Sequence, residues 1–168
     1  MMNNRKVSLA LLIFVSLLAG CGGTGGKDSA TKPKMFRANL GLTMGGEFNE
    51  AVDMIVYSRY RYIRSGDSRN YPNKINVVTE WQARFIFDDE RELGIVAVES
   101  RIFLTAKLRP GQASSMRGES TYNATMRAEN RVKYAEGQSW QPGPITTQAR
   151  NYFRDIVDDL MQEIKKPY

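Results

Sequence analysis

The chain has 168 residues, and its 24 lysine and arginine side chains against 18 aspartate and glutamate side chains give a formal net charge of +6. It contains no histidine and a single cysteine, so an intrachain disulfide is excluded and the commonest general base and metal ligand are missing. We therefore expect no cofactor, no metal and no Ser-His-Asp or Cys-His catalysis. The positive excess is small and dispersed, which argues against nucleic acid as a partner.

Residues 1–20 have the order of a secretion signal. The basic pair Arg5-Lys6 is followed by an apolar run over 7–18 and then by small residues before Cys21. The apolar run is shorter than the roughly 20 residues that a membrane-spanning helix needs. We therefore interpret residues 1–20 as a signal peptide that is removed.

The sequence Leu18-Ala19-Gly20-Cys21 resembles the lipobox of bacterial lipoproteins. This resemblance implies a diacylglycerol thioether on Cys21, cleavage before it, and acylation of the new amino terminus, for example with palmitate. Gly22 is not the aspartate that favours inner-membrane retention, which implies a lipid anchor in the outer membrane with the protein on the periplasmic face. The alternative is an ordinary secreted protein with a chance cysteine at the cleavage site.

Residues 21–34 comprise this cysteine and a stretch of glycine and polar residues without apolar periodicity. Such a composition is typical of a flexible tether, whose upper reach here is about 40 Å. The remaining residues, 35–168, have the size of one domain with a single core. We expect this part to be a single α+β periplasmic domain.

The first part of the domain predicts one strand and one helix. Residues 35–44 alternate loosely as a strand does, and from 47 to 60 apolar residues recur at helical spacing behind acidic residues that suit a first turn. The β-branched and tyrosine-rich stretch 55–63 is also compatible with a strand, so residues 54–64 can be helix or strand. Turn-forming residues predict a loop over 65–73.

Three later segments alternate with the two-residue period of half-buried strands: 75–87, 95–108 and 119–134. Polar turns over 88–94 and 109–118 connect them as an antiparallel meander with one dry face. On the first segment the predicted inward residues are Val77, Thr79, Trp81, Ala83, Phe85 and Phe87. On the other two they are Val96, Val98, Ile102, Leu104, Ala106, Leu108, Tyr122, Ala124, Met126, Ala128, Val132 and Tyr134.

A helix is predicted to close the chain. Proline and glycine at 142–144 break the preceding structure, Thr146 or Thr147 can cap the helix, and an unbroken apolar stripe follows to Ile164. The dry face of the meander needs such a cover. We therefore predict an α+β fold in which an antiparallel β-meander of three to four strands carries an N-terminal and a C-terminal helix packed on one face.

Arginine and tyrosine side chains interleave over residues 57–74. Guanidinium groups bind phosphates with paired hydrogen bonds, and tyrosine rings can stack on sugars or lipid, so an anionic glycolipid or a peptidoglycan strand is a fitting ligand. The alternative is a solvated helix end whose tyrosines complete the core. The candidate contact residues are Arg59, Tyr60, Arg61, Tyr62 and Arg64.

Two further features have both a functional and a structural interpretation. Asp88, Asp89 and Glu90 can bind a hard cation or act as the acid and base of a hydrolase, but a turn uses the same residues, and their spacing lacks the alternation of a calcium loop. Trp140 lies in a loop rich in proline and glycine. It is either an anchor for a partner or a plug over the end of the core.

Behind the lipobox, the order of elements over 35–166 is a strand, a helix, three meandering strands and a closing helix. This order resembles the lipopolysaccharide-assembly lipoprotein family, whose members plug and support an outer-membrane β-barrel translocon. The resemblance implies a barrel protein as partner and contact with lipopolysaccharide through Arg59, Arg61 and Arg64. We therefore expect a non-enzymatic outer-membrane lipoprotein that binds a partner protein in envelope assembly. The alternative is a glycolipid- or peptidoglycan-binding carrier that uses residues 57–74.

Overall fold

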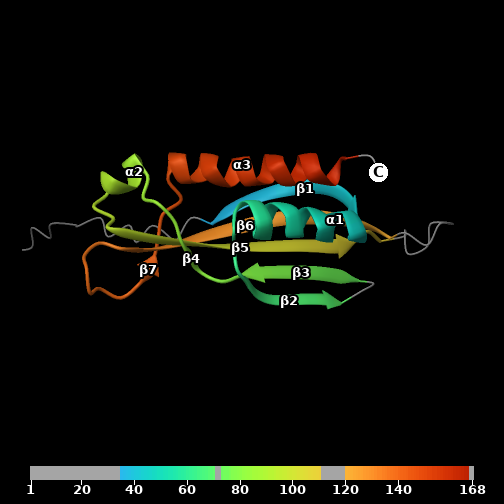
Figure 1. Ribbon diagram of the computed structural model, residues 1–168, viewed down its shortest axis with the longest axis horizontal. Helices are drawn as coiled ribbons and strands as arrows, with labels where there is room; N and C mark the ends of the chain where they lie inside the picture. The colour runs from blue at the N-terminus through green and yellow to red at the C-terminus, as the bar shows by residue number, and fades with distance from the viewer. Residues whose placement is uncertain (1–34, 71–72, 111–119, 167–168) are drawn as a thin grey trace, which may run out of the picture. The chain divides into compact units, whose positions relative to one another are not determined.

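The computed structural model describes residues 35–70, 73–110 and 120–166, which form an α+β fold (Figure 1). The predicted signal peptide, Cys21 and the tether lie outside the described residues. The elements are, in chain order, β1 (Phe36–Met44), α1 (Gly45–Ala51), the π-helix η1 (Val52–Arg59), β2 (Arg64–Asn70), β3 (Lys74–Thr79), β4 (Gln82–Ala83), α2 (Asp88–Arg91), β5 (Ala97–Leu108), β6 (Thr121–Lys133), β7 (Gln141–Pro142) and α3 (Thr147–Ile164).

The strands form one antiparallel sheet of seven strands within the described residues. Its main order is β1-β6-β5-β3-β2, with β4 paired to β5 and β7 paired to β6. The predicted meander is confirmed as the neighbours β3, β5 and β6. The sheet is larger than the three to four strands that we predicted, because β1 adds to one edge and β2 to the other.

The predicted loop over 65–73 is wrong for most of its length. Residues Arg64–Asn70 form β2, which pairs with β3 as a hairpin from Arg64 opposite Thr79 to Asn70 opposite Lys74. The segment is polar and contains Gly66, so it shows no two-residue apolar period. Backbone hydrogen bonds to a neighbouring strand define it, and a sequence pattern does not record these.

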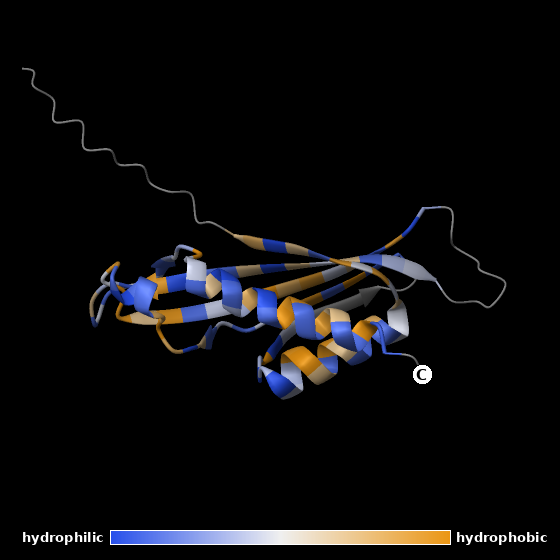
Figure 2. Cartoon of the chain, turned by 90° about the horizontal axis from the view of Figure 1, so that it is seen from above, coloured by the Kyte–Doolittle hydropathy of each residue, from blue (hydrophilic) through white to orange (hydrophobic). Residues whose placement is uncertain are grey.

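The helices α1, η1 and α3 lie side by side on one face of the sheet, as Figure 2 shows from above. The helix predicted over 47–60 is confirmed, and the strand alternative for 55–63 is wrong because helix continues to Arg59. Helix α3 begins where its cap predicts: the Thr146 hydroxyl accepts a hydrogen bond from the Ala149 amide at 3.3 Å.

The core lies between these helices and the sheet, and the predicted stripe of α3 supplies much of it. Burial of each large apolar side chain contributes about 1.5–3 kcal/mol, which is enough to hold the helices on the sheet. The largest fully buried apolar side chains are Tyr122, Phe48, Phe153, Ile75, Ile102, Leu104, Met126, Ile156 and Leu160.

The strand predicted over 75–87 is interrupted by an extra residue. Val78 lies opposite Phe103, whereas Gln82 lies opposite Ser100, so four steps along one strand match three along its partner. A shift of one residue exchanges the two faces of a strand. Trp81, predicted to share a face with Val77 and Thr79, therefore points to the opposite side of the sheet.

Four more residues that we predicted to face inward are exposed, and the first of them, Ala83, is turned outward by the same shift because it lies opposite Glu99. Phe85 is 66% exposed, Val96 46% and Tyr134 42%. Val96 and Tyr134 follow directly beyond the last β5–β6 pair, Ala97 with Lys133, so regular strand alternation no longer applies to them. Phe85 lies after β4, in a segment without strand pairing.

Candidate ligand-binding face

The predicted arginine and tyrosine site does not form one common surface. Arg59 is paired with Asp159 of α3, its Nη1 lying 2.9 Å from Oδ1. The Tyr60 hydroxyl donates to the other oxygen of Asp159 at 2.7 Å. Burial and the Asp159 carboxylate raise the pKa of Tyr60 above its ordinary range. These two residues therefore connect η1 to α3.

Tyr62 belongs to the core, where only 4% of its surface is exposed. Its hydroxyl lies 3.5 Å from the hydroxyl of Tyr152, and burial raises the pKa of both phenols. This position favours the structural interpretation of the tyrosines. It also leaves Tyr62 without access to a ligand in solution.

The other two arginines of the predicted site, Arg61 and Arg64, are exposed, as the ion-paired Arg59 also is. The Arg64 guanidinium lies 2.8 Å from the Asp53 carboxylate and 4.7 Å from the centre of the Tyr57 ring. Arg61 forms no ion pair or hydrogen bond with another described residue, and its φ of 57° places it in the left-handed region. Arg61 thus occupies a helix-terminating position that ordinarily favours glycine.

The three carboxylates at 88–90 each have a different partner and do not form one site. Glu90 is fully buried against Arg84, Asp88 pairs with Arg91, and Asp89 accepts a hydrogen bond from the Gln148 amide at 2.9 Å. Within the described ranges no three histidine, cysteine, aspartate or glutamate side chains gather as a metal site would require. The structural interpretation of this cluster is the one that the contacts support.

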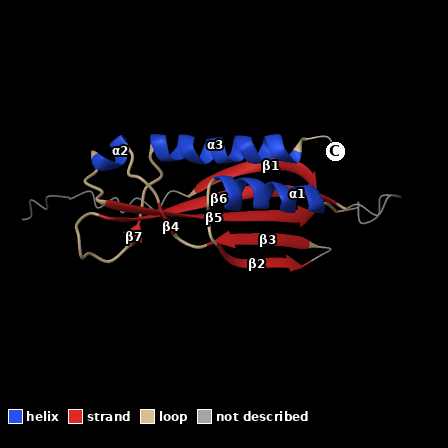
Figure 3. Ribbon diagram, in the orientation of Figure 1, coloured by secondary structure: helices blue, strands red, loops and turns tan. Residues whose placement is uncertain are grey.

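The side of the sheet opposite α1, η1 and α3 carries a different set of side chains. Figure 3 shows these helices on one side only, and we call the other side the helix-free face. Its strand residues follow from the pairing register, because residues directly opposite each other share a face. They include Arg37, Asn39, Leu42, Lys74, Asn76, Val78, Glu99, Arg101, Phe103, Thr105, Lys107, Asn123, Thr125, Arg127, Glu129, Arg131 and Lys133.

Cations and aromatic rings alternate across this face. The Phe103 ring centre lies 4.9 Å from the Arg101 guanidinium carbon and 5.1 Å from that of Arg127. Arg101 also lies 5.7 Å from the Trp81 ring, and Arg131 lies 4.8 Å from the same ring. Each such contact is attractive because the face of an aromatic ring is negative.

The series continues onto the loop before β7. Arg131 lies 4.9 Å from the Trp140 ring, and Lys133 Nζ lies 4.7 Å from it. Arg131 is therefore between the two tryptophans. We call the seven residues the cation–aromatic ladder; in spatial order they are Arg127, Phe103, Arg101, Trp81, Arg131, Trp140 and Lys133.

Local structure positions each member of the ladder. Arg101, Phe103, Arg127 and Arg131 alternate with core residues on β5 and β6, and the extra residue before β4 turns Trp81 to the same side. Pairing of Pro142 with Arg131 brings the Trp140 loop back over β6. Trp140 thus packs on cations of the helix-free face and belongs to neither core cluster.

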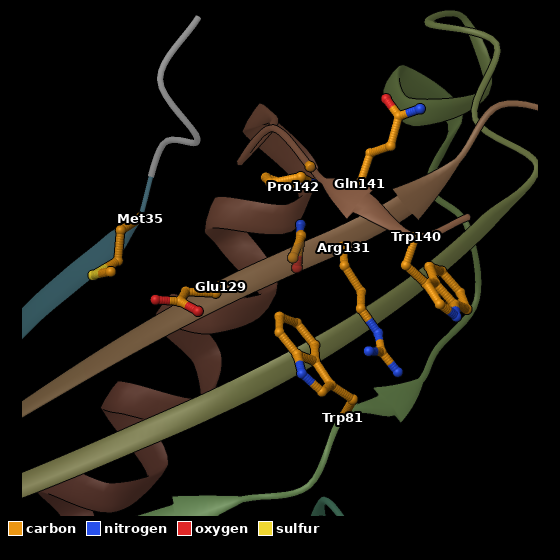
Figure 4. A pocket seen from close by; sticks show the side chains of 9 residues that line it. Met35, Trp81, Glu129, Arg131, Trp140, Gln141 and Pro142 are labelled. Atoms are coloured by element: carbon orange, nitrogen blue, oxygen red, sulfur yellow. The ribbon is translucent and has the colours of Figure 1, made fainter. Parts of the chain in front are cut away.

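A cavity of about 350 Å³ opens beside the ladder (Figure 4). Trp81, Arg131 and Trp140 form one wall, and the side chains of Glu129 and Met35 lie farther along it. Met35 is the first described residue, so the chain enters the fold at this cavity. The remaining lining residues are Asn130, Gln141, Pro142 and Gly143.

The helix-free face is strongly basic. Seven of its strand residues are lysine or arginine and two, Glu99 and Glu129, are acidic. Glu99 pairs with Arg131, but among the described residues Arg37, Arg101 and Arg127 form no ion pair. The Arg101 Nε is buried and has no hydrogen-bond partner there. Such guanidinium groups can bind carboxylate or phosphate oxygens.

Comparison of the chain with protein-family models, with curated proteins and with solved structures finds no match. Over the residues that the structure describes, no helix has both the length and the apolar character needed to cross a membrane.

Proposed function

We propose that this protein is a non-enzymatic, lipid-anchored binding protein of the bacterial outer membrane that faces the periplasm. It acts in envelope assembly by holding an anionic partner on the helix-free face of its sheet. The lipobox at Cys21 supports the anchor, and a sequence without histidine supports a binding role over catalysis.

The cation–aromatic ladder is the observation that carries this proposal. Its rings hold the arginines in place before a ligand arrives, which reduces the side-chain entropy that binding would otherwise lose. A guanidinium stacked on a ring still has free N–H edges, so Arg101 and Arg127 can bind anionic oxygens of a partner. Aromatic and arginine side chains are also the residue types that dominate binding energy at interfaces.

Site-specific photo-crosslinking in living cells tests the proposal. A photoreactive residue in place of Thr125, exposed on the helix-free face, should capture an envelope component. The same residue in place of Arg154, exposed on α3, is the matched control and should capture none. Equal adducts from both positions, or none from either, would contradict a binding role for this face.

A carrier of glycolipid or peptidoglycan that acts through residues 57–74 is the second candidate. Arg61, exposed and unpaired among the described residues, supports it, whereas the ion pairs of Arg59 and Arg64 support it less. The affinity for lipopolysaccharide or muropeptides, measured by titration, should then be lower in a variant with Arg59, Arg61 and Arg64 replaced by alanine. Unchanged binding in that variant would remove this candidate.

A further inference from the structure

We propose that the helix-free face docks on a bilayer that contains anionic phospholipids, so that the domain lies against the membrane that carries its anchor. In this orientation α1, η1 and α3 face away from the lipid. The inference rests on the proposed function, because it names the anionic partner of the same face.

The distribution of charge on the two sides of the domain favours this orientation. The basic residues of the helix-free face are spread over β1, β3, β5 and β6, and they outnumber its acids by seven to two. The exposed side of α3 carries both signs, with Arg150 and Arg154 beside Asp155 and Asp158. A negatively charged surface therefore attracts the sheet side more strongly.

The chemistry of the ladder suits the boundary between headgroups and acyl chains. Indole rings combine an apolar body with one N–H donor, and for this reason tryptophan collects at membrane interfaces. Trp81 and Trp140 both lie here, with Arg131 between their rings. The neighbouring Arg101 forms no ion pair within the described residues, so its terminal guanidinium nitrogens can donate to a lipid phosphate.

The described fold begins beside this face. Met35, its first residue, lines the same cavity as Trp81 and Trp140. Residues 22–34 reach about 40 Å at most when fully extended. A tether of that length gives an effective concentration on the order of 1 mM, at which even a weak contact is occupied.

Fluorescence of the lipidated full chain in vesicles tests the docking directly, because its two tryptophans are Trp81 and Trp140. The protein is reconstituted in phosphatidylcholine vesicles with brominated acyl chains, with or without phosphatidylglycerol. We expect bromine to quench the emission when phosphatidylglycerol is present, and high salt to reverse the quenching. Quenching that is absent in both kinds of vesicle, or equal in both, would overturn the docking.

Charge variants sharpen this test. Replacing Arg37, Lys107 and Arg127 with glutamine should weaken docking about fivefold for each residue and roughly 100-fold in total. The matched control replaces Arg150, Arg154 and Lys165, which are exposed on α3 or at its end, and should leave the quenching unchanged. The proposed orientation would be contradicted if the control variant lost its quenching, or if the sheet variant kept it unchanged. Unchanged urea midpoints show that both variants are folded.

The photo-crosslinking experiment distinguishes this inference from the function on which it rests. If phosphatidylglycerol produces no quenching while position 125 still captures a protein or glycolipid, docking on lipid is overturned and the binding role stands. If position 125 captures nothing and no quenching occurs, both are overturned.

Discussion

Arg84 and Glu90 form a buried, two-point ion pair, with Nη2 lying 2.6 Å from Oε1 and Nη1 2.9 Å from Oε2. Their side chains are 5% and 0% exposed. Arg84 Nε also donates to the Ser100 hydroxyl at 2.9 Å, and Glu90 accepts from the Phe87 amide at 3.1 Å. The pair therefore fastens α2 and the segment before it to β5.

Replacing Glu90 with alanine should destabilise the protein by about 3–5 kcal/mol, because the Arg84 charge is then buried without its partner. The double variant Arg84→Met with Glu90→Leu should be more stable than Glu90→Ala, since no buried charge is left. Urea denaturation followed by circular dichroism measures both. A single variant with wild-type stability would show that the Arg84–Glu90 pair does not hold α2.

Replacing Arg61 with glycine should give a more stable protein than replacing it with a β-branched residue. Its φ of 57° is strained for a side chain with a Cβ. We expect Arg61→Gly to raise the free energy of unfolding by about 0.5–1 kcal/mol and Arg61→Val to lower it. Thermal unfolding of both variants checks the sign, and a loss of stability in Arg61→Gly would contradict the assigned backbone conformation.

The free energy of unfolding should fall at alkaline pH, because the buried phenols of Tyr62 and Tyr152 are more costly to ionise in the folded state. Burial raises the pKa of Tyr62 and Tyr152 in the folded state, so their neutral forms stabilise the fold. This contribution is complete below the unfolded pKa of about 10 and is lost as the pH rises beyond it. Tyr62→Phe should match the wild type closely at pH 8 and lose less stability above pH 10. Urea midpoints measured across this range test the difference, and parallel curves would contradict it.

Gly143 allows the loop before α3 to approach β6 closely. A Cβ at this position would lie 2.5 Å from Cγ1 of Val132, and the Gly143 amide donates to the Asn130 carbonyl at 2.8 Å. Gly143→Ala should therefore lower the free energy of unfolding by about 1–3 kcal/mol. Val132→Ala in the same chain should offset part of that loss.

Gly46→Ala is the control for the Gly143 variant, since a Cβ added to Gly46 in α1 would have no atom within 4 Å. We expect it to be neutral or stabilising, because alanine favours helix more than glycine does. Urea denaturation measures the free energy of unfolding of each variant. Additive effects of Gly143→Ala and Val132→Ala in a double-mutant cycle would show that the two positions are not in contact.

The sequence predicts those elements whose burial is periodic. Strands β5 and β6 and helix α3 alternate core and solvent positions with the expected period, so their side chains identify them. Strand β2 has no such period because its segment is polar, and its pairing with β3 is visible only in the folded chain.

The candidate site was less predictable, because it is assembled from separate segments. The sequence predicts that Ile102, Ala128 and Val132 face inward, which correctly leaves their neighbours Arg101, Arg127 and Arg131 on the outward side, and it marks Trp140 as a candidate contact. It cannot show that Trp81 joins them, since strict alternation predicts the opposite face for that residue. The interleaved residues at 59–64 are close in sequence, yet η1 ends among them and directs them to different surroundings.

The extra residue between β3 and β4 gives the ladder an allowed variation in chain length. Deletion of Glu80 would place Trp81 one step after Thr79 and keep Gln82 opposite Ser100, so that simple alternation is restored. Trp81 would then stay on the helix-free face, next to Arg101. Homologous chains that lack this residue but keep Trp81 and the cations are thus expected to retain the surface.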